Sequence, residues 1–400
     1  MKSSISISKS LISQLNRDYH EIRQKLVRKG YSFDQIPQNK TAISDVGEAF
    51  SLAYPVQGLL KYHGFSDSKE HIAYFPSISL NNGCLFTVSY LKFDKSLNND
   101  VVFLNGSPGV GETYQNVKNS LDYIRNFSGI KTKAILVSRN YSPSKVNGKG
   151  LGTSASGSAA LAIAATSIIY DNNPEFMNNR RLVSIFSRYL SGSGCRSSSG
   201  EISLWLSYPN INPLDSFAIN LIREEHQKFI KSISLLTIPI KSAIKTTQAH
   251  KIAPKSPFFE AWLLKRKELV LEFLEGLDNH DLKKVGDLSE FDTLCLHAVA
   301  MTAPNDQNII AWSPDTLKVI LGVRELRKNG YEVYYSIDTG PSLVLLTKKS
   351  QAEEIYKEIK MIIPNHEIIK GSFGGPSRLL DLKSPEIKIL EADIAAFIEK

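Results

Sequence analysis

The sequence predicts an α+β protein built in two halves, and three observations lead to this class. The 400 residues are too many for one small core and fit two packed domains of ordinary size. Hydrophobic residues make up 42% and charged residues 22% of the chain, which is typical of a soluble, folded protein. Helix and strand patterns are mixed without strict βαβ alternation, so we do not expect a regular parallel sheet.

Residues 1–50 are predicted to form a partly helical extension. Residues 11–30 carry apolar side chains at helical spacing and end at Gly30, a residue type suited to the end of a helix. We expect this helix to pack on the main body. The N-terminal domain is assigned to residues 51–225 and the C-terminal domain to residues 226–400.

Both domains are expected to contain strands and helices in irregular order. In the first, strands and turns are predicted at 75–93 and 101–105, an amphipathic helix at 112–127 and a buried strand at 133–138. In the second, the expected elements are a buried strand at 234–240, helices at 258–275 and 312–329, two strands around a tight turn at 339–341, and a final amphipathic helix at 351–361. The helix at 312–329 has Ser313 and Pro314 as its capping and first residues.

The charge of the chain favours a small anionic ligand. The net charge is +8 and the pI is about 9.1, which suits an anionic partner. The basic residues are dispersed and follow no nucleic-acid-binding motif, so no nucleic acid is expected. No apolar run reaches the length of a membrane span, and charges interrupt the N-terminus too often for a secretory signal. Three scattered cysteines fit neither a disulfide framework nor a metal site, so we expect a cytoplasmic protein without a metal.

The stretch "KGLGTSASGSAALAIAA" at 149–165 is a candidate phosphate site. A glycine-rich turn that leads into a helix offers backbone N–H groups and the positive end of the helix dipole to an anion. Glycines at 150, 152 and 157 would let the backbone approach the ligand, and hydroxyls would come from Ser154, Ser156 and Ser158. The stretch is neither a Walker A loop nor a clean GxGxxG fingerprint, so from its residues alone it could also be an ordinary turn.

Further motifs give this stretch a context. It resembles the phosphate-binding motif of the GHMP kinase superfamily (galactose, homoserine, mevalonate and phosphomevalonate kinases). Five other stretches, in the right order, resemble the mevalonate decarboxylase branch: "VQGLLKYHGF" (56–65), "FPSISLN" (75–81), "FLNGSP" (103–108), "SGSGCRSSSGEISLW" (191–205) and "YYSIDTGPSLVLL" (334–346). The similarity runs from about residue 51 to 350. It implies a two-domain GHMP fold with the active site in the cleft between the domains, and a homodimer, as is common in relatives.

The resemblance also implies roles for individual residues. Asp338 falls on the catalytic aspartate, Arg196 on the arginine that contacts the substrate carboxylate, and Lys61 on a lysine able to neutralise phosphate or orient the aspartate. The implied substrate-binding residues are Gln57, Tyr62, Gly152, Thr153, Ser154 and Ser193.

Taken alone, several of these residues have plainer explanations. An aspartate before Gly-Pro is ordinarily a turn former, and Arg196 could belong to a surface ion pair. His63, His71 and His250 have no nucleophile or metal-ligand spacing beside them, so we interpret them as structural.

The departures from the branch pattern bear on the substrate. The approach to the glycine loop is three residues longer ("SKVNGK", 144–149), the usual asparagine is Val56, and two usually cationic positions are Phe65 and Val101. Loss of two cations suggests a 5-monophosphate group, and the altered approach puts ATP in doubt.

These departures fit the mevalonate 3,5-bisphosphate decarboxylases of the archaeal Thermoplasma-type pathway. Such enzymes receive a substrate that is already phosphorylated at position 3, so no cofactor is expected. The loop would then hold a phosphate of the substrate. Alternatives that stay open are an ATP/Mg-dependent decarboxylase of 5-phosphomevalonate or 5-diphosphomevalonate, a mevalonate 3-kinase, and a non-enzymatic sensor on the same fold.

Overall fold

The computed structural model describes residues 7–144, 150–241, 246–304 and 307–398. Its strands are β1 (Gly47–Ala53), β2 (Val56–Leu60), β3 (Phe65–Asp67), β4 (Ile72–Ala73), β5 (Ser77–Asn81), β6 (Phe86–Asp94), β7 (Val101–Leu104), β8 (Ser107–Pro108), β9 (Lys133–Tyr141), β10 (Ile202–Leu206), β11 (Phe217–Asn220), β12 (Ile233–Ile238), β13 (Val333–Ser336), β14 (Leu343–Lys348), β15 (Ile369–Gly371) and β16 (Arg378–Leu380).

The helices alternate irregularly with these strands, as the α+β prediction requires. They are α1 (Lys9–Arg28), α2 (Gly111–Ser128), α3 (Thr153–Ile169), α4 (Pro174–Met177), α5 (Arg180–Leu190), α6 (Gly194–Ser199), α7 (Gln227–Lys231), α8 (Thr246–Ile252), α9 (Phe259–Asp278), α10 (Leu282–Met301), α11 (Pro314–Lys328), α12 (Ala352–Ile362) and α13 (Lys388–Ile398). None of these helices is long and apolar enough to cross a membrane.

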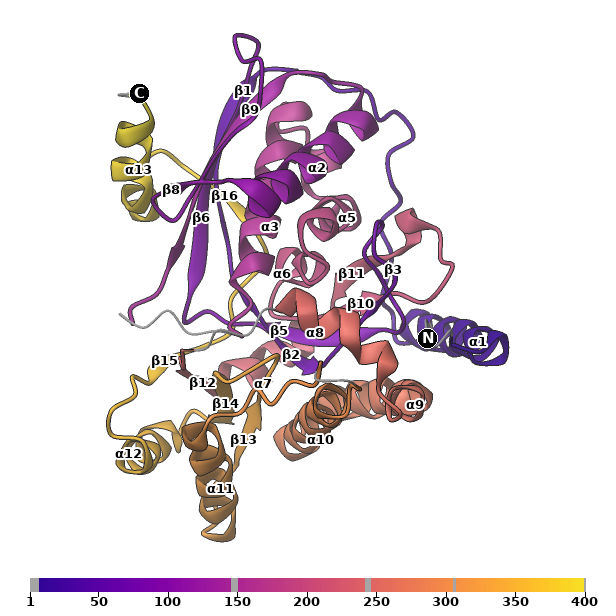
Figure 1. Cartoon of the computed structure of the whole chain (residues 1–400), viewed down its shortest axis with the longest axis vertical. Coiled ribbons are helices and arrows are strands. Elements are labelled where there is room, and N and C mark those ends of the chain that lie inside the picture. The colour runs from indigo at the N-terminus through magenta and orange to yellow at the C-terminus, as the bar shows by residue number, and fades with distance from the viewer. Residues whose placement is uncertain (1–6, 145–149, 242–245, 305–306, 399–400) are drawn as a thin grey trace.

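The first half is built on a six-stranded sheet in the order β16-β1-β6-β9-β7-β8, in which only β7 and β9 pair in parallel. Helix α3 packs on one face of this sheet, against β1 and β6, and α13 packs on the other face (Figure 1). The small residues of "AALAIAA" let α3 lie close to the sheet, where Ala159, Ala160 and Ala162 are fully buried. The approach is close enough for the Ser51 hydroxyl of β1 to donate to the Ala160 carbonyl oxygen over 2.8 Å.

Two further four-stranded sheets complete the core, ordered β11-β10-β5-β2 and β13-β14-β12-β15. The boundary predicted near residue 225 falls between β11 and β12, where the chain passes from one of these sheets to the other. Helix α10 packs against both β2 and β13 and so joins the two sheets. Gly286 makes this approach possible, because a Cβ there would overlap the ring of Tyr334.

The chain returns to the six-stranded sheet at its C-terminal end. Strand β16 pairs with β1, and α13 covers β9 and β6 (Figure 1). The prediction that the helix at 351–361 is the last one is therefore wrong, since α13 follows α12. Helix α10 was not predicted either; its buried residues lie on several sides because it packs on β2, on β13 and on α9.

The N-terminal extension packs on the body, as predicted. Helix α1 lies against α9 and buries Leu11, Leu15, Tyr19, Ile22 and Leu26. Gly30 follows the helix with a φ of +86°, a conformation that glycine adopts without strain.

Candidate active site

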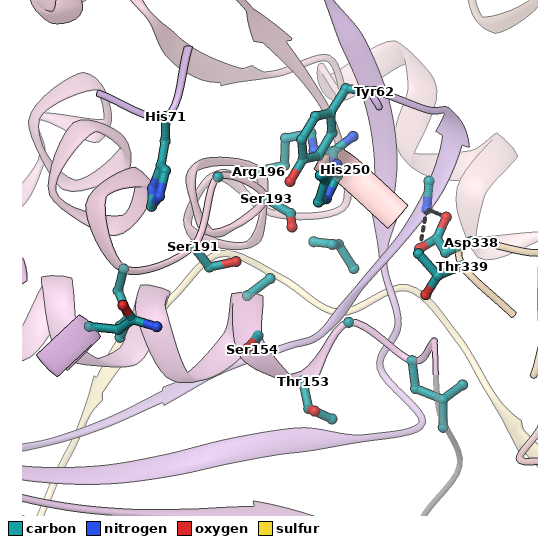
Figure 2. Close-up of a pocket in the computed structure, with 18 of the residues that line it drawn as sticks. Tyr62, His71, Thr153, Ser154, Ser191, Ser193, Arg196, His250, Asp338 and Thr339 are labelled. Atoms are coloured by element: carbon teal, nitrogen blue, oxygen red, sulfur yellow. Dashed lines mark hydrogen bonds between the residues drawn. The ribbon is translucent and has the colours of Figure 1, made fainter. Parts of the chain in front are cut away.

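A cavity of about 1400 Å³ brings together residues that are far apart in the sequence. Its walls come from the end of β2, the start of α3, the turn before α6, helix α8, and the turn between β13 and β14. Eight of the nine predicted site residues line it: Lys61, Tyr62, Gly152, Thr153, Ser154, Ser193, Arg196 and Asp338. Figure 2 shows the labelled side chains arranged around this common space.

The glycine loop lies directly against β2. Gly152 has a φ of +68°, and a Cβ there would lie 2.2 Å from the Val56 carbonyl oxygen. On its other side the loop meets the β13–β14 turn, because a Cβ on Gly150 would lie 3.0 Å from the Gly340 nitrogen. Among the described residues no side chain caps the start of α3, and its first two N–H groups, those of Thr153 and Ser154, are available to an anion in the cavity.

Only one of the three predicted loop hydroxyls is exposed. Ser154 is exposed at the start of α3, next to the half-buried Thr153. The Ser156 hydroxyl donates to the Thr153 carbonyl oxygen over 2.9 Å, and the Ser158 hydroxyl donates to the Ser187 carbonyl oxygen. Because both are fully buried further along the helix, the prediction that they serve as ligand donors is wrong.

Asp338 and Lys61 form an ion pair at the cavity wall. The Lys61 Nζ lies 3.3 Å from the Asp338 Oδ1, and it also donates to the Ser336 hydroxyl over 2.8 Å. The Gly58 backbone N–H lies 3.0 and 3.2 Å from the two Asp338 carboxylate oxygens (Figure 2). These contacts fix the carboxylate while leaving 25% of its side chain exposed.

The environment of Lys61 acts on its charge in two directions. Burial lowers the pKa of Lys61, while the negative charges of Asp338 and Asp292 oppose this change. Its side chain is only 2% exposed, so the ammonium group is held by fixed partners rather than by water.

Arg196 is buried in α6 and belongs to no surface ion pair. Its Nη1 donates to the Ser77 hydroxyl over 3.0 Å, and its guanidinium lies 5.2 Å from the centre of the Tyr62 ring. Within the described ranges no carboxylate pairs with it, and its Nε has no partner. A buried guanidinium without a carboxylate can bind one from a ligand.

Tyr62 and Ser193 lie beside this arginine (Figure 2). The Tyr62 ring stacks on His250 with centroids 4.9 Å apart and meets the edge of Trp205. Burial raises the pKa of Tyr62, so its hydroxyl stays protonated and can donate a hydrogen bond.

Gln57 is the predicted site residue that does not line the cavity. Its side chain is buried behind β2, and Nε2 donates to the Ser336 hydroxyl over 3.0 Å. Side chains alternate between the faces of a strand, so Gln57 points away from the cavity that its neighbours line. Its contact with a ligand is not supported.

The three histidines interpreted as structural all line the cavity. Burial lowers the pKa of His63 to about 3, and burial also lowers the pKa of His71 and of His250. The His71 Nδ1 donates to the Arg188 carbonyl oxygen over 2.8 Å, and the His250 Nδ1 accepts from the Gly64 N–H over 3.2 Å. Burial therefore keeps all three rings neutral, and backbone contacts fix two of them.

Sequence reasoning missed three residues of this centre: Gly58, Ser336 and Asp292. Gly58 and Ser336 lie inside motifs that were noticed, but nothing marked them as partners of Lys61. Asp292 lies outside every motif and carries no local signal.

The structure locates only some of the positions at which the sequence departs from the decarboxylase branch pattern. The lengthened approach to the loop lies mostly at 145–149, outside the described residues. Phe65 lines the cavity, whereas Val101 begins β7. In the part of the chain that the structure describes, no group of three or more histidine, cysteine or acidic side chains could hold a metal ion.

The fold and the site resemble those of a GHMP-type protein, with a glycine loop at a helix N-terminus and an aspartate–lysine pair lining the same cavity. Residues 53–218 match the family model of the diphosphomevalonate decarboxylase-like N-terminal domain. This match confirms the resemblance to the mevalonate decarboxylase branch.

Solved structures establish the same fold. The mevalonate diphosphate decarboxylase of Enterococcus faecalis superposes with a TM-score of 0.74 at 24% identity, covering 84% of this chain and 99% of that one. The mevalonate-3-kinase of Thermoplasma acidophilum gives a TM-score of 0.69 at 16% identity, covering 84% of this chain and 99% of that one.

Curated relatives are similar over most of the chain, and they are decarboxylases. The mevalonate 3,5-bisphosphate decarboxylase of Thermoplasma volcanium is 29% identical over 85% of this chain and 87% of its own length. The phosphomevalonate decarboxylase of Haloferax volcanii is 28% identical over 84% of this chain and 98% of its own length.

Proposed function

We propose that this chain is a carboxy-lyase that converts mevalonate 3,5-bisphosphate into isopentenyl phosphate, inorganic phosphate and CO2 without ATP. The C3–O bond breaks and the phosphate leaves with the electron pair. The C1–C2 bond then breaks, C1 leaves as CO2, and its electron pair forms the C2=C3 double bond. No oxidant, reductant or further phosphate donor is needed for this balance.

The residues of the cavity support this chemistry. The N–H groups at the start of α3, with Thr153 and Ser154, would hold the departing 3-phosphate. Arg196 would hold the substrate carboxylate with its planar guanidinium. Asp338 would stabilise the positive charge that develops at C3, and Lys61 would keep its carboxylate in place.

The observation that carries the proposal is the convergence of these groups on one cavity. The Asp338–Lys61 pair, the buried Arg196 without a carboxylate partner, and the start of α3 all face it (Figure 2). An anion with a carboxylate at one end and a phosphate at C3 matches these groups. The sequence similarity to mevalonate 3,5-bisphosphate decarboxylases supports the same substrate.

The test is to incubate the purified protein with mevalonate 3,5-bisphosphate and EDTA, without nucleotide, and to measure CO2 and phosphate. Equal release of both is expected. No release there, followed by CO2 from 5-phosphomevalonate or 5-diphosphomevalonate only with Mg-ATP, would overturn the proposal.

A second candidate is an ATP/Mg-dependent decarboxylase of 5-phosphomevalonate. The observation in its favour is the size of the cavity, which exceeds the range of about 300–1,000 Å³ common for small-molecule sites. Its walls also include residues from the turn after β7 and from α2: Asn105, Asn116, Asn119, Tyr123 and Asn126. The Mg-ATP arm of the same experiment separates this candidate from the first.

We further propose a cytoplasmic homodimer. The free cysteines Cys84, Cys195 and Cys295 suit a reducing compartment, and the resemblance to the decarboxylase branch favours the dimer. Light scattering coupled to size exclusion should give twice the chain mass of 44.5 kDa, and a mass of one chain would contradict the dimer.

A further inference from the structure

We propose that Asp292 is a positioning residue that fixes Lys61 from behind the cavity wall. The proposal rests on the proposed function. Asp292 is fully buried in α10 and does not line the cavity. Its Oδ2 accepts the Lys61 backbone N–H, and its Oδ1 accepts Trp262 Nε1 over 2.8 Å and Nη1 of Arg266.

The Lys61 N–H needs a partner because β2 ends at Leu60. Beyond that residue the backbone leaves the strand ladder, yet Lys61 stays buried. A buried N–H without an acceptor is costly, and Asp292 supplies the acceptor. The main chain of Lys61 is thus held while its Nζ reaches Asp338.

Arg266 connects the Asp292 carboxylate with the surroundings of Arg196, the other buried cation at the cavity. Its guanidinium is buried between the rings of Phe75 and Trp262, at 4.4 and 5.2 Å, and its Nη2 donates to the Pro76 carbonyl oxygen over 3.4 Å. The next residue, Ser77, accepts the hydrogen bond from Arg196. The buried Asp292–Arg266 pair therefore contacts Lys61 through Asp292, and through Arg266 it contacts Pro76, which precedes Ser77, the partner of Arg196.

Asp292 also contributes charge near Lys61. Charged or titratable groups from α6, α9, α10 and the β13–β14 turn act on Lys61 or on Asp292. They are Arg196, Arg266, Asp292, Cys295, His297 and Asp338. Removing the negative charge of Asp292 takes away one of the two carboxylates that favour the ammonium form of Lys61.

Asp100 provides a matched control. It is a buried carboxylate that pairs with Arg125 and accepts the Ala134 backbone N–H over 2.9 Å, but it does not line the cavity or contact Lys61. Asp100→Asn and Asp292→Asn therefore break the same kind of buried contact, and only one of them bears on the site.

The experiment compares both variants with the wild type by thermal melting, kcat, KM and pH profile. The assay uses whichever reaction the wild type catalyses, with or without Mg-ATP. A wrong substrate assignment is therefore detected with the wild type alone and does not affect the comparison of the two variants. Both variants should lose stability. Only Asp292→Asn should lose kcat, by about 10- to 100-fold, with a smaller change in KM. Its activity should also fall at a lower alkaline pH than that of the wild type.

Equal kcat and pH profiles for the two folded variants would overturn the proposal. If Asp292→Asn does not fold, Trp262→Phe removes one donor to the carboxylate and keeps an aromatic ring. A smaller loss of kcat with little change in KM is then expected, while the alkaline limb stays close to that of the wild type because Asp292 keeps its negative charge. A wild-type kcat in folded Trp262→Phe would equally overturn the proposal.

Discussion

Replacing Gly152 with alanine tests whether the glycine loop holds the 3-phosphate. The new Cβ would lie 2.2 Å from the Val56 carbonyl oxygen and 2.8 Å from its nitrogen, and both are backbone atoms. The gap must widen by about 1 Å before the atoms reach a tolerable contact. The φ of +68° adds strain of about 1–2 kcal/mol for an L-residue.

A displacement of this size moves the N–H groups of Thr153 and Ser154 away from the phosphate. We expect kcat to fall about 100-fold, because misplacement by about 1 Å has effects of that order. The assay is phosphate release from mevalonate 3,5-bisphosphate, with thermal melting to confirm folding.

Gly157→Ala is the matched control on the same helix. A Cβ there meets nothing within 4 Å, and Gly157 does not line the cavity. It should keep wild-type kcat and gain about 0.5–1 kcal/mol of stability from the better helix propensity of alanine. A folded Gly152→Ala variant with wild-type kcat would refute the assignment of the loop.

Three further predictions concern other parts of the molecule. Asp338→Asn should abolish most turnover in a protein that still folds, with a lower melting temperature because the buried Lys61 loses its carboxylate partner; undiminished turnover would remove Asp338 from its role. Activity should fall as pH rises through the pKa of Lys61. Because burial lowers this pKa, the alkaline limb of the pH profile should lie below about 10.4. The residual activity of Lys61→Met should lack this limb. Ile22→Ala, in the buried face of α1, should cost about 2–5 kcal/mol in urea unfolding with kcat unchanged, whereas the exposed Val27→Ala should change stability by less than about 0.5 kcal/mol; equal effects would mean that α1 does not stabilise the body.

Local patterns predicted the elements that depend on local rules. The helix at 112–127 became α2 (Gly111–Ser128), and Ser313 caps α11 through a hydrogen bond from the Thr316 N–H over 3.1 Å. Helices α10 and α13 were not predicted, and the strands on which they pack are distant in the sequence, although α10 also packs on the neighbouring helix α9. Asp292 escaped for the same reason: its partners come from the end of β2 and from α9, and no spacing in the sequence reports such a meeting.

Asp338 shows why a motif needs the tertiary structure to be interpreted. By its sequence it could be a turn former, which would use its carboxylate on N–H groups two or three residues further along. Instead both oxygens face the Gly58 N–H, 280 residues away, and Oδ1 faces the Lys61 ammonium. The carboxylate is therefore held by β2 and not by its own turn. The Asp338 carboxylate therefore keeps its position only while β2 and the β13–β14 turn stay together. Helix α10 packs on both β2 and β13 and so holds them together.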